Sequence, residues 1–78
     1  MALTHDLVAE TNLLVLFSLS STQEGLKVHK HSAAPEAVAA AERLYQKGLV
    51  TQNDGGYLTD LGIEAAEHAQ RLTAILTS

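Results

Sequence analysis

Leucine and alanine dominate this sequence, with 13 and 12 occurrences against three aromatic residues in total. Both are strong helix formers, so their abundance favours a helical domain over a β-sandwich. The chain has 78 residues and no cysteine. A chain of this length forms one small domain with a thin core, and no disulfide supports it. We therefore expect a single domain over residues 1–78 that is mainly α.

The charge and hydropathy of the chain exclude several classes of protein. Five basic and nine acidic residues give a net charge of −4, which argues against a generic basic protein that coats nucleic acid. The longest apolar run, residues 13–17, is far shorter than the roughly 18 residues of a membrane helix. No basic residue precedes Lys27, so the first residues do not resemble a secretory signal. We expect a cytoplasmic protein without membrane contact.

Polar or glycine-rich breaks divide the chain into four segments, and they lie at residues 18–22, 27–35 and 53–56. The first segment predicts a helix over about residues 4–19, whose apolar arc is wider than one core face needs. This helix is either simply the central core helix or also packs against a second subunit. The second segment predicts a short helix over about residues 22–28, because Ser21 and Glu24 have the spacing of a capping box.

The second half of the chain contains clearer start and stop signals. A helix is predicted over about residues 34–47, with Pro35 in its first turn and Gly48 as its left-handed cap. Two β-prone runs then flank the turn at residues 53–56, which is typical of a β-hairpin. The last helix is predicted over about residues 59–76, with Thr59 as its N-cap. Its apolar stripe comprises Leu58, Leu61, Ala65, Ala69, Leu72 and Leu76.

Part of this second half resembles the pattern of winged helix-turn-helix regulators. Bacterial MarR-like and PadR-like regulators commonly have two short motifs on either side of the wing. Before the wing, a leucine is followed after two residues by Lys-Gly-Leu. After the wing, Leu-Thr is followed after two residues by a glycine. The matching residues are Leu44, Lys47, Gly48, Leu49, Leu58, Thr59 and Gly62. The resemblance, which extends to small uncharacterised bacterial proteins, covers about half of the chain. It implies a winged helix with about four helices and a two-stranded wing, mainly α with a small β-hairpin.

The same resemblance implies a small DNA-binding protein, a transcriptional regulator or an accessory factor. In such regulators a helix enters the major groove with its N-terminal residues, and side-chain donors contact phosphates and base edges. The basic residues concentrate between Lys27 and His31. The alternative interpretation of this segment is a solvated turn without a ligand. The candidate residues for contact with double-stranded DNA are Lys27, His29, Lys30, Ser32, Arg43 and Gln46.

A second hypothesis is a module of the same fold that binds a protein partner and no nucleic acid. The acidic balance, the apolar outward residues Val38 and Ala39, and Asp54 at the hairpin tip favour it. Excess apolar surface on the first and last helices also predicts a homodimer. The residues expected in that contact are Leu13, Val15, Leu16, Leu19, Ile63, Ile75 and Leu76.

Other chemistry finds little support in the sequence. His29 and His31 are weak evidence for a metal site, because no third ligand lies near them in the sequence. The sequence contains no phosphate-binding loop, no nucleophile elbow and no plausible triad. We expect a protein that is not an enzyme and that uses no cofactor and no metal.

Overall fold

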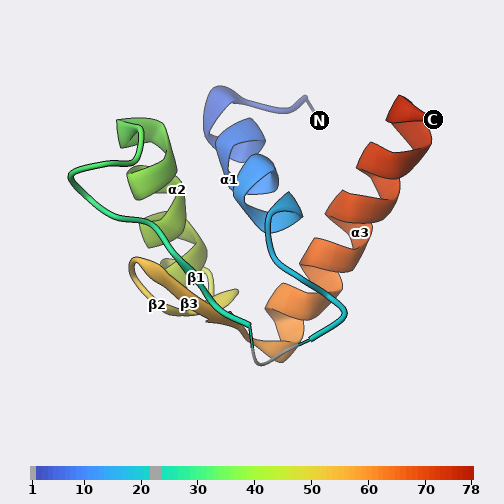
Figure 1. Ribbon diagram of the computed structural model, residues 1–78. Coiled ribbons are helices and arrows are strands. Elements are labelled where there is room, and N and C mark those ends of the chain that lie inside the picture. The colour runs from blue at the N-terminus through green and yellow to red at the C-terminus, as the bar shows by residue number, and fades with distance from the viewer. Residues whose placement is uncertain (1, 22–23) are drawn as a thin grey trace.

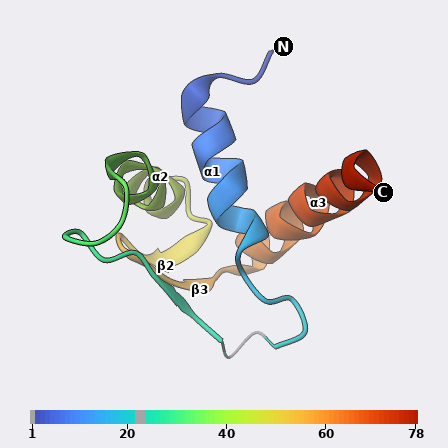
Figure 2. The ribbon, with the colours of Figure 1, turned by 45° about the horizontal axis from the view of Figure 1, so that its top comes forward.

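The computed structural model describes residues 2–21 and 24–78 and places three helices over a small sheet (Figure 1). The helices are α1 (His5–Val15), α2 (Pro35–Gln46) and α3 (Asp60–Thr77). The strands are β1 (Leu26–Lys27), β2 (Val50–Gln52) and β3 (Gly55–Leu58), in the antiparallel order β1-β3-β2. The central helix is α1, which packs against both α2 and α3, and α3 leans away from it toward the C-terminus (Figures 1 and 2).

The predicted winged helix with about four helices and a two-stranded wing is wrong. The described chain has three helices and a three-stranded antiparallel sheet, which is a small α+β fold. The difference lies in the helix expected over residues 22–28. In its place Leu26 and Lys27 form β1, which pairs with Gly56 and Gly55 of β3. Residues 22 and 23 lie outside the described part of the chain.

The glycines of β3 explain why this segment pairs as a strand. A Cβ atom at Gly55 would lie 2.2 Å from the carbonyl oxygen of Leu26, so only a glycine allows β1 to approach so closely. The N–H of Val28 then donates to the carbonyl oxygen of Asp54 at 2.8 Å and continues the contact beyond β1. Backbone pairing with a distant strand therefore replaces the local helix.

The remaining elements follow the sequence closely. α2 lies within one residue of the predicted range 34–47, and Gly48 after it has φ of 79°, so its left-handed cap is confirmed. The hairpin of β2 and β3 is also confirmed. The side chain of Thr59 accepts a hydrogen bond from the N–H of Gly62 at 3.0 Å, which confirms it as the N-cap of α3. α1 is shorter than predicted, since it ends at Val15 rather than at residue 19.

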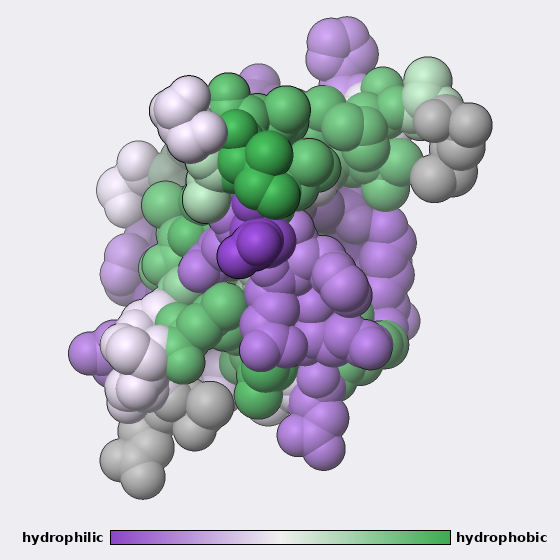
Figure 3. Space-filling view, turned by 90° about the vertical axis from the view of Figure 1, so that its right-hand side faces the viewer, coloured by the Kyte–Doolittle hydropathy of each residue, from purple (hydrophilic) through white to green (hydrophobic). Residues whose placement is uncertain are grey.

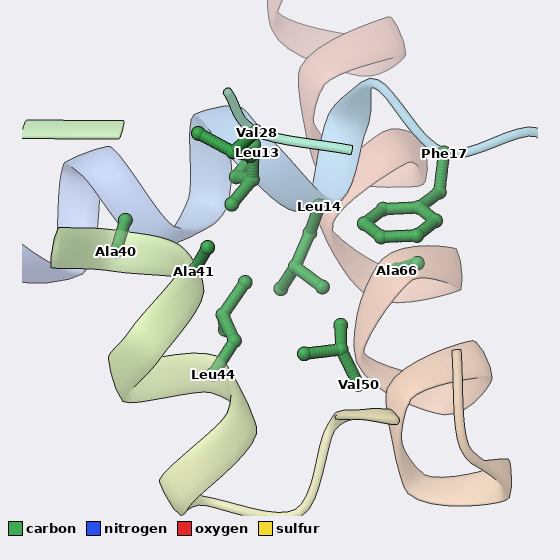
Figure 4. Packing of buried hydrophobic residues seen from close by; sticks show 9 residues of the cluster. All are labelled: Leu13, Leu14, Phe17, Val28, Ala40, Ala41, Leu44, Val50 and Ala66. Atoms are coloured by element: carbon green, nitrogen blue, oxygen red, sulfur yellow. The ribbon is translucent and has the colours of Figure 1, made fainter. Parts of the chain in front are cut away.

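The core lies where the three helices meet the sheet. Leu14 reaches from α1 into the space between α2 and α3 (Figure 4). Ala40 and Ala41 are fully buried, and their small side chains let α1 approach α2 closely. The buried apolar cluster consists of Leu13, Leu14, Phe17, Val28, Ala40, Ala41, Leu44, Val50 and Ala66.

Candidate functional site

Three of the six predicted DNA-binding residues lie on the loop between β1 and α2. His29, Lys30 and Ser32 are exposed there, and the N–H of Ser32 donates to the carbonyl oxygen of His29 at 3.1 Å. This turn lies in the loop that leads into the N-terminal end of α2. Gln46 is also exposed, but it is the last residue of α2, about 16 Å along the helix axis from Pro35. The structure therefore separates Gln46 from the loop.

The side chain of Lys27 contacts the hairpin formed by β2 and β3. Its ammonium group lies 3.0 Å from a carboxylate oxygen of Asp54 and donates to the side-chain oxygen of Gln52 at 3.0 Å. The ion pair is half exposed, so it is weak by itself. It nevertheless places a carboxylate beside the cation, which reduces the attraction that Lys27 offers to a phosphate.

Arg43 points toward α1 rather than outward. Its Nε donates to a carboxylate oxygen of Glu10 at 2.9 Å, and its Nη2 donates to the backbone oxygen of Asp6 at 3.3 Å. Lys47, one turn later on α2, donates to the other carboxylate oxygen of Glu10. We call Glu10, Arg43 and Lys47 the α1–α2 clasp. Two of the five lysine and arginine side chains are used here to hold helices together.

The clasp controls the ionisation of Glu10, which is only 5% exposed. Burial by itself raises the pKa of this carboxyl group, because the charged form loses its hydration. The hydrogen bonds and charges of Lys47 and Arg43 outweigh that cost and hold the pKa of Glu10 below its ordinary value. The clasp is therefore fully charged at neutral pH.

A pocket of about 250 Å³ lies beside the basic loop. Its charged lining is mixed, because Glu42 and Asp54 line it together with Lys30. A lining of this kind does not concentrate the positive potential that a phosphate needs. Within residues 2–21 and 24–78 no group of three or more His, Cys, Asp or Glu is placed to hold a metal ion.

The other notable surface is apolar and belongs to α3. Leu61, Leu72, Ile75 and Leu76 are 53%, 52%, 58% and 74% exposed, and we call them the apolar flank of α3. With α3 facing the viewer, Figure 3 shows hydrophobic side chains gathered in the upper part of this face, above a band of hydrophilic ones. Large exposed aliphatic side chains grouped on one element are typical of a contact surface.

The sequence analysis placed several of these side chains wrongly. Leu61, Leu72 and Leu76, which the sequence analysis placed on one apolar stripe of the last helix, are all exposed. The buried positions of α3 are instead Gly62 and Ala66. Conversely, Leu13 was assigned to a subunit contact but is 5% exposed and belongs to the core.

Among the other residues expected in the subunit contact, Leu16, Ile75 and Leu76 are exposed, while Val15, Leu19 and Ile63 are partly buried. Leu61, Leu72 and Ile75 belong to a series of α3 positions, 61, 65, 68, 72 and 75, whose steps alternate between four and three residues, and this spacing was the signal for the exposed side of the helix.

Over residues 2–21 and 24–78, the structure defines a small α+β domain of three helices and a three-stranded antiparallel sheet. No helix in the described part of the chain is long and apolar enough to cross a membrane. The chain belongs to the Family of unknown function (DUF5669), whose model matches residues 1–77. Searches among curated proteins and among solved structures find no match.

Proposed function

We propose that the chain is a protein–protein interaction module whose binding surface is the apolar flank of α3. The observation that carries this proposal is the exposure of four large aliphatic side chains on one helix, each by more than half. Isolated helix ends fray in water unless side-chain packing stabilises them. α3 nevertheless continues to Thr77 with Ile75 and Leu76 exposed, which is the state expected of a helix that a partner covers.

The charges of the domain also favour a protein partner. Lys27, Arg43 and Lys47 are engaged with carboxylates of the same chain. Affinity for DNA scales with the number of cations that displace counterions from the phosphates, so paired cations contribute less. A net charge of −4 adds a general repulsion of nucleic acid.

DNA binding is a second candidate, because His29, Lys30 and Ser32 are exposed on the loop that leads into α2. Backbone phosphates are often bound by such loops and helix N-termini. The two functions use different surfaces, since the loop and the apolar flank of α3 lie on different elements. Each can therefore be tested without disturbing the other.

The test of this proposal uses a photoreactive benzophenone amino acid in place of Leu72 in the intact chain, expressed in the cells that make it. Thr51, exposed on β2, is the control position. We expect irradiation to join position 72, and not position 51, to a protein that mass spectrometry identifies. In parallel, fluorescence polarisation with short duplex DNA at about 50 mM and 200 mM salt is expected to show no saturable binding.

The opposite pattern would overturn the proposal. Saturable binding of duplex DNA that weakens with salt and is lost in Lys30→Ala, together with no adduct from position 72, assigns the function to the basic loop. Lys30→Ala leaves the apolar flank of α3 unchanged, so the two results are independent of one another.

A further inference from the structure

The exposed side of α3 carries a regular seam. Leu61, Ala65, His68, Leu72 and Ile75 follow one another at spacings of four, three, four and three residues. This repeat of 3.5 residues is the pattern with which two helices pack along their length. Three of the five are large aliphatic side chains that are more than half exposed. We call these five residues the α3 seam.

The α3 seam lies beside the face by which α3 packs on its own domain. Gly62 and Ala66 are buried on that inner face, and Gln70 contacts the end of α1 there. On a helix with 3.6 residues per turn, Leu72 and His68 project more than a quarter turn away from Ala66. A second helix can therefore lie along the seam without displacing α1.

Two charged residues border the seam on its outer side. Glu64 directly precedes Ala65, and Arg71 directly precedes Leu72, so they occupy equivalent places in successive repeats. Both side chains are exposed. Positions of this kind form the ion pairs that set partner choice and orientation between packed helices.

These features fit a second copy of α3 in antiparallel orientation. In that arrangement Leu61 lies opposite Leu72 of the second copy, and Ala65 lies opposite His68, so the small side chain accommodates the imidazole ring. Glu64 then lies beside Arg71 of the second copy, and two-fold symmetry repeats each contact. A parallel pair would instead place Glu64 and Arg71 beside alanine or leucine, with no opposite charge.

We propose that the chain forms an antiparallel homodimer through the α3 seam, with two Glu64–Arg71 ion pairs across the interface. This inference rests on the proposed interaction function and names its partner. The seam spans about 21 Å of helix, which is short for a coiled coil, so dimerisation depends on protein concentration.

Reciprocal charge exchange tests the register directly. Glu64→Arg and Arg71→Glu each place like charges across both pairs, and each is expected to weaken self-association about tenfold in sedimentation velocity experiments. An equimolar mixture of the two variants restores both pairs and should form a heterodimer. The double variant E64R/R71E should also recover the homodimer. The matched control is Glu42→Arg, which makes the same charge change at an exposed position on α2.

A second pair of variants tests the apolar part of the seam. Leu72→Asp is expected to give a monomer, whereas Leu3→Asp, which changes a still more exposed leucine outside the seam, should leave the dimer intact. Circular dichroism verifies that both variants fold.

Two results would contradict the dimer. One is a monomer at concentrations on the order of 100 µM for the unmodified protein. The other is a dimer whose interface the variants do not locate in the seam. This would be the case if Glu64→Arg and Glu42→Arg weakened self-association equally, or if Leu72→Asp left the dimer intact. If the purified protein is a monomer while position 72 still crosslinks to a different protein, the homodimer fails and the proposed interaction function stands. If position 72 forms no adduct and duplex DNA binds, the interaction function itself fails.

Discussion

Gly62 shows how a single residue positions a whole helix in this domain. A Cβ atom at this position would lie 1.9 Å from the carbonyl oxygen of Leu49, so the first turn of α3 touches the backbone that leads into β2. Gly48 has a different requirement. Its φ of 79° favours glycine, but nothing lies within 4 Å of the space that a Cβ would occupy. Gly62 is required because a side chain would clash with the backbone at Leu49, whereas Gly48 is required because its backbone has a positive φ.

This difference predicts unequal costs for the same substitution. Gly62→Ala forces the backbones apart and should lower the free energy of unfolding by about 2 kcal/mol, although alanine itself favours the helix by roughly 1 kcal/mol. Gly48→Ala should cost about 1 kcal/mol, because only the left-handed conformation is disfavoured. Urea denaturation of the two variants measures both values. A smaller loss for Gly62→Ala than for Gly48→Ala would show that the close approach to Leu49 is not important for stability.

At the scale of the elements, Gln70 connects α3 to the end of α1. Its Nε2 donates to the carbonyl oxygen of Phe17 at 2.7 Å and lies 3.4 Å from the carbonyl oxygens of Leu14 and Val15. The last carbonyl groups of a helix have no partner within the helix and must find one elsewhere. One amide from α3 thus satisfies the end of α1 where the sequence predicted a further turn.

We therefore expect Gln70→Leu to destabilise the domain although it adds an apolar side chain. The variant removes the side-chain donor from the carbonyl oxygens of Val15 and Phe17 at the end of α1, which costs about 1–2 kcal/mol. Gln46→Leu, at an exposed position on α2, is the matched control and should change stability little. Thermal unfolding of both variants gives the comparison. Equal melting temperatures would mean that Gln70 does not stabilise the end of α1.

At the scale of the whole molecule, the α1–α2 clasp links folding to pH. The pKa of Glu10 is lower in the folded chain than its ordinary value, so the unfolded chain binds more protons in mild acid. The stability that the clasp contributes is therefore fully present above the ordinary value of 4.5 and is lost as the pH falls through the lower, folded value.

Replacing Glu10 should change both the level and the pH dependence of stability. Glu10→Gln is expected to lower the free energy of unfolding at neutral pH by about 2 kcal/mol, less than for a fully buried pair because Lys47 is half exposed. The variant should also lose part of the decline in stability that the unmodified protein shows as the pH falls below the ordinary carboxyl value of 4.5. Glu36→Gln, exposed on α2, is the control. Parallel pH profiles for the unmodified protein and Glu10→Gln would contradict this role.

The elements that can be predicted from the sequence are those whose start and stop signals are local. Pro35 and Gly48 delimit α2, Thr59 begins α3, and residues 53–56 form the hairpin turn. Each of these residues acts on backbone groups within a few positions of itself, so the local sequence is sufficient to predict where the element begins or ends. The exposure of His29, Lys30 and Ser32 in a turn follows from the same kind of signal.

Features that depend on residues distant in the sequence could not be predicted and became visible in the folded domain. β1 replaces the predicted helix because Leu26 and Lys27 meet glycines of β3 far along the chain. Arg43 faces inward because Glu10 lies across the interface of α1 and α2. The inner face of α3 consists of small residues, since helices and strands approach too closely for leucine, and this leaves Leu61 and Leu72 outside. Hydrogen bonds, charges and packing depend on separation in space, which the local sequence pattern does not contain.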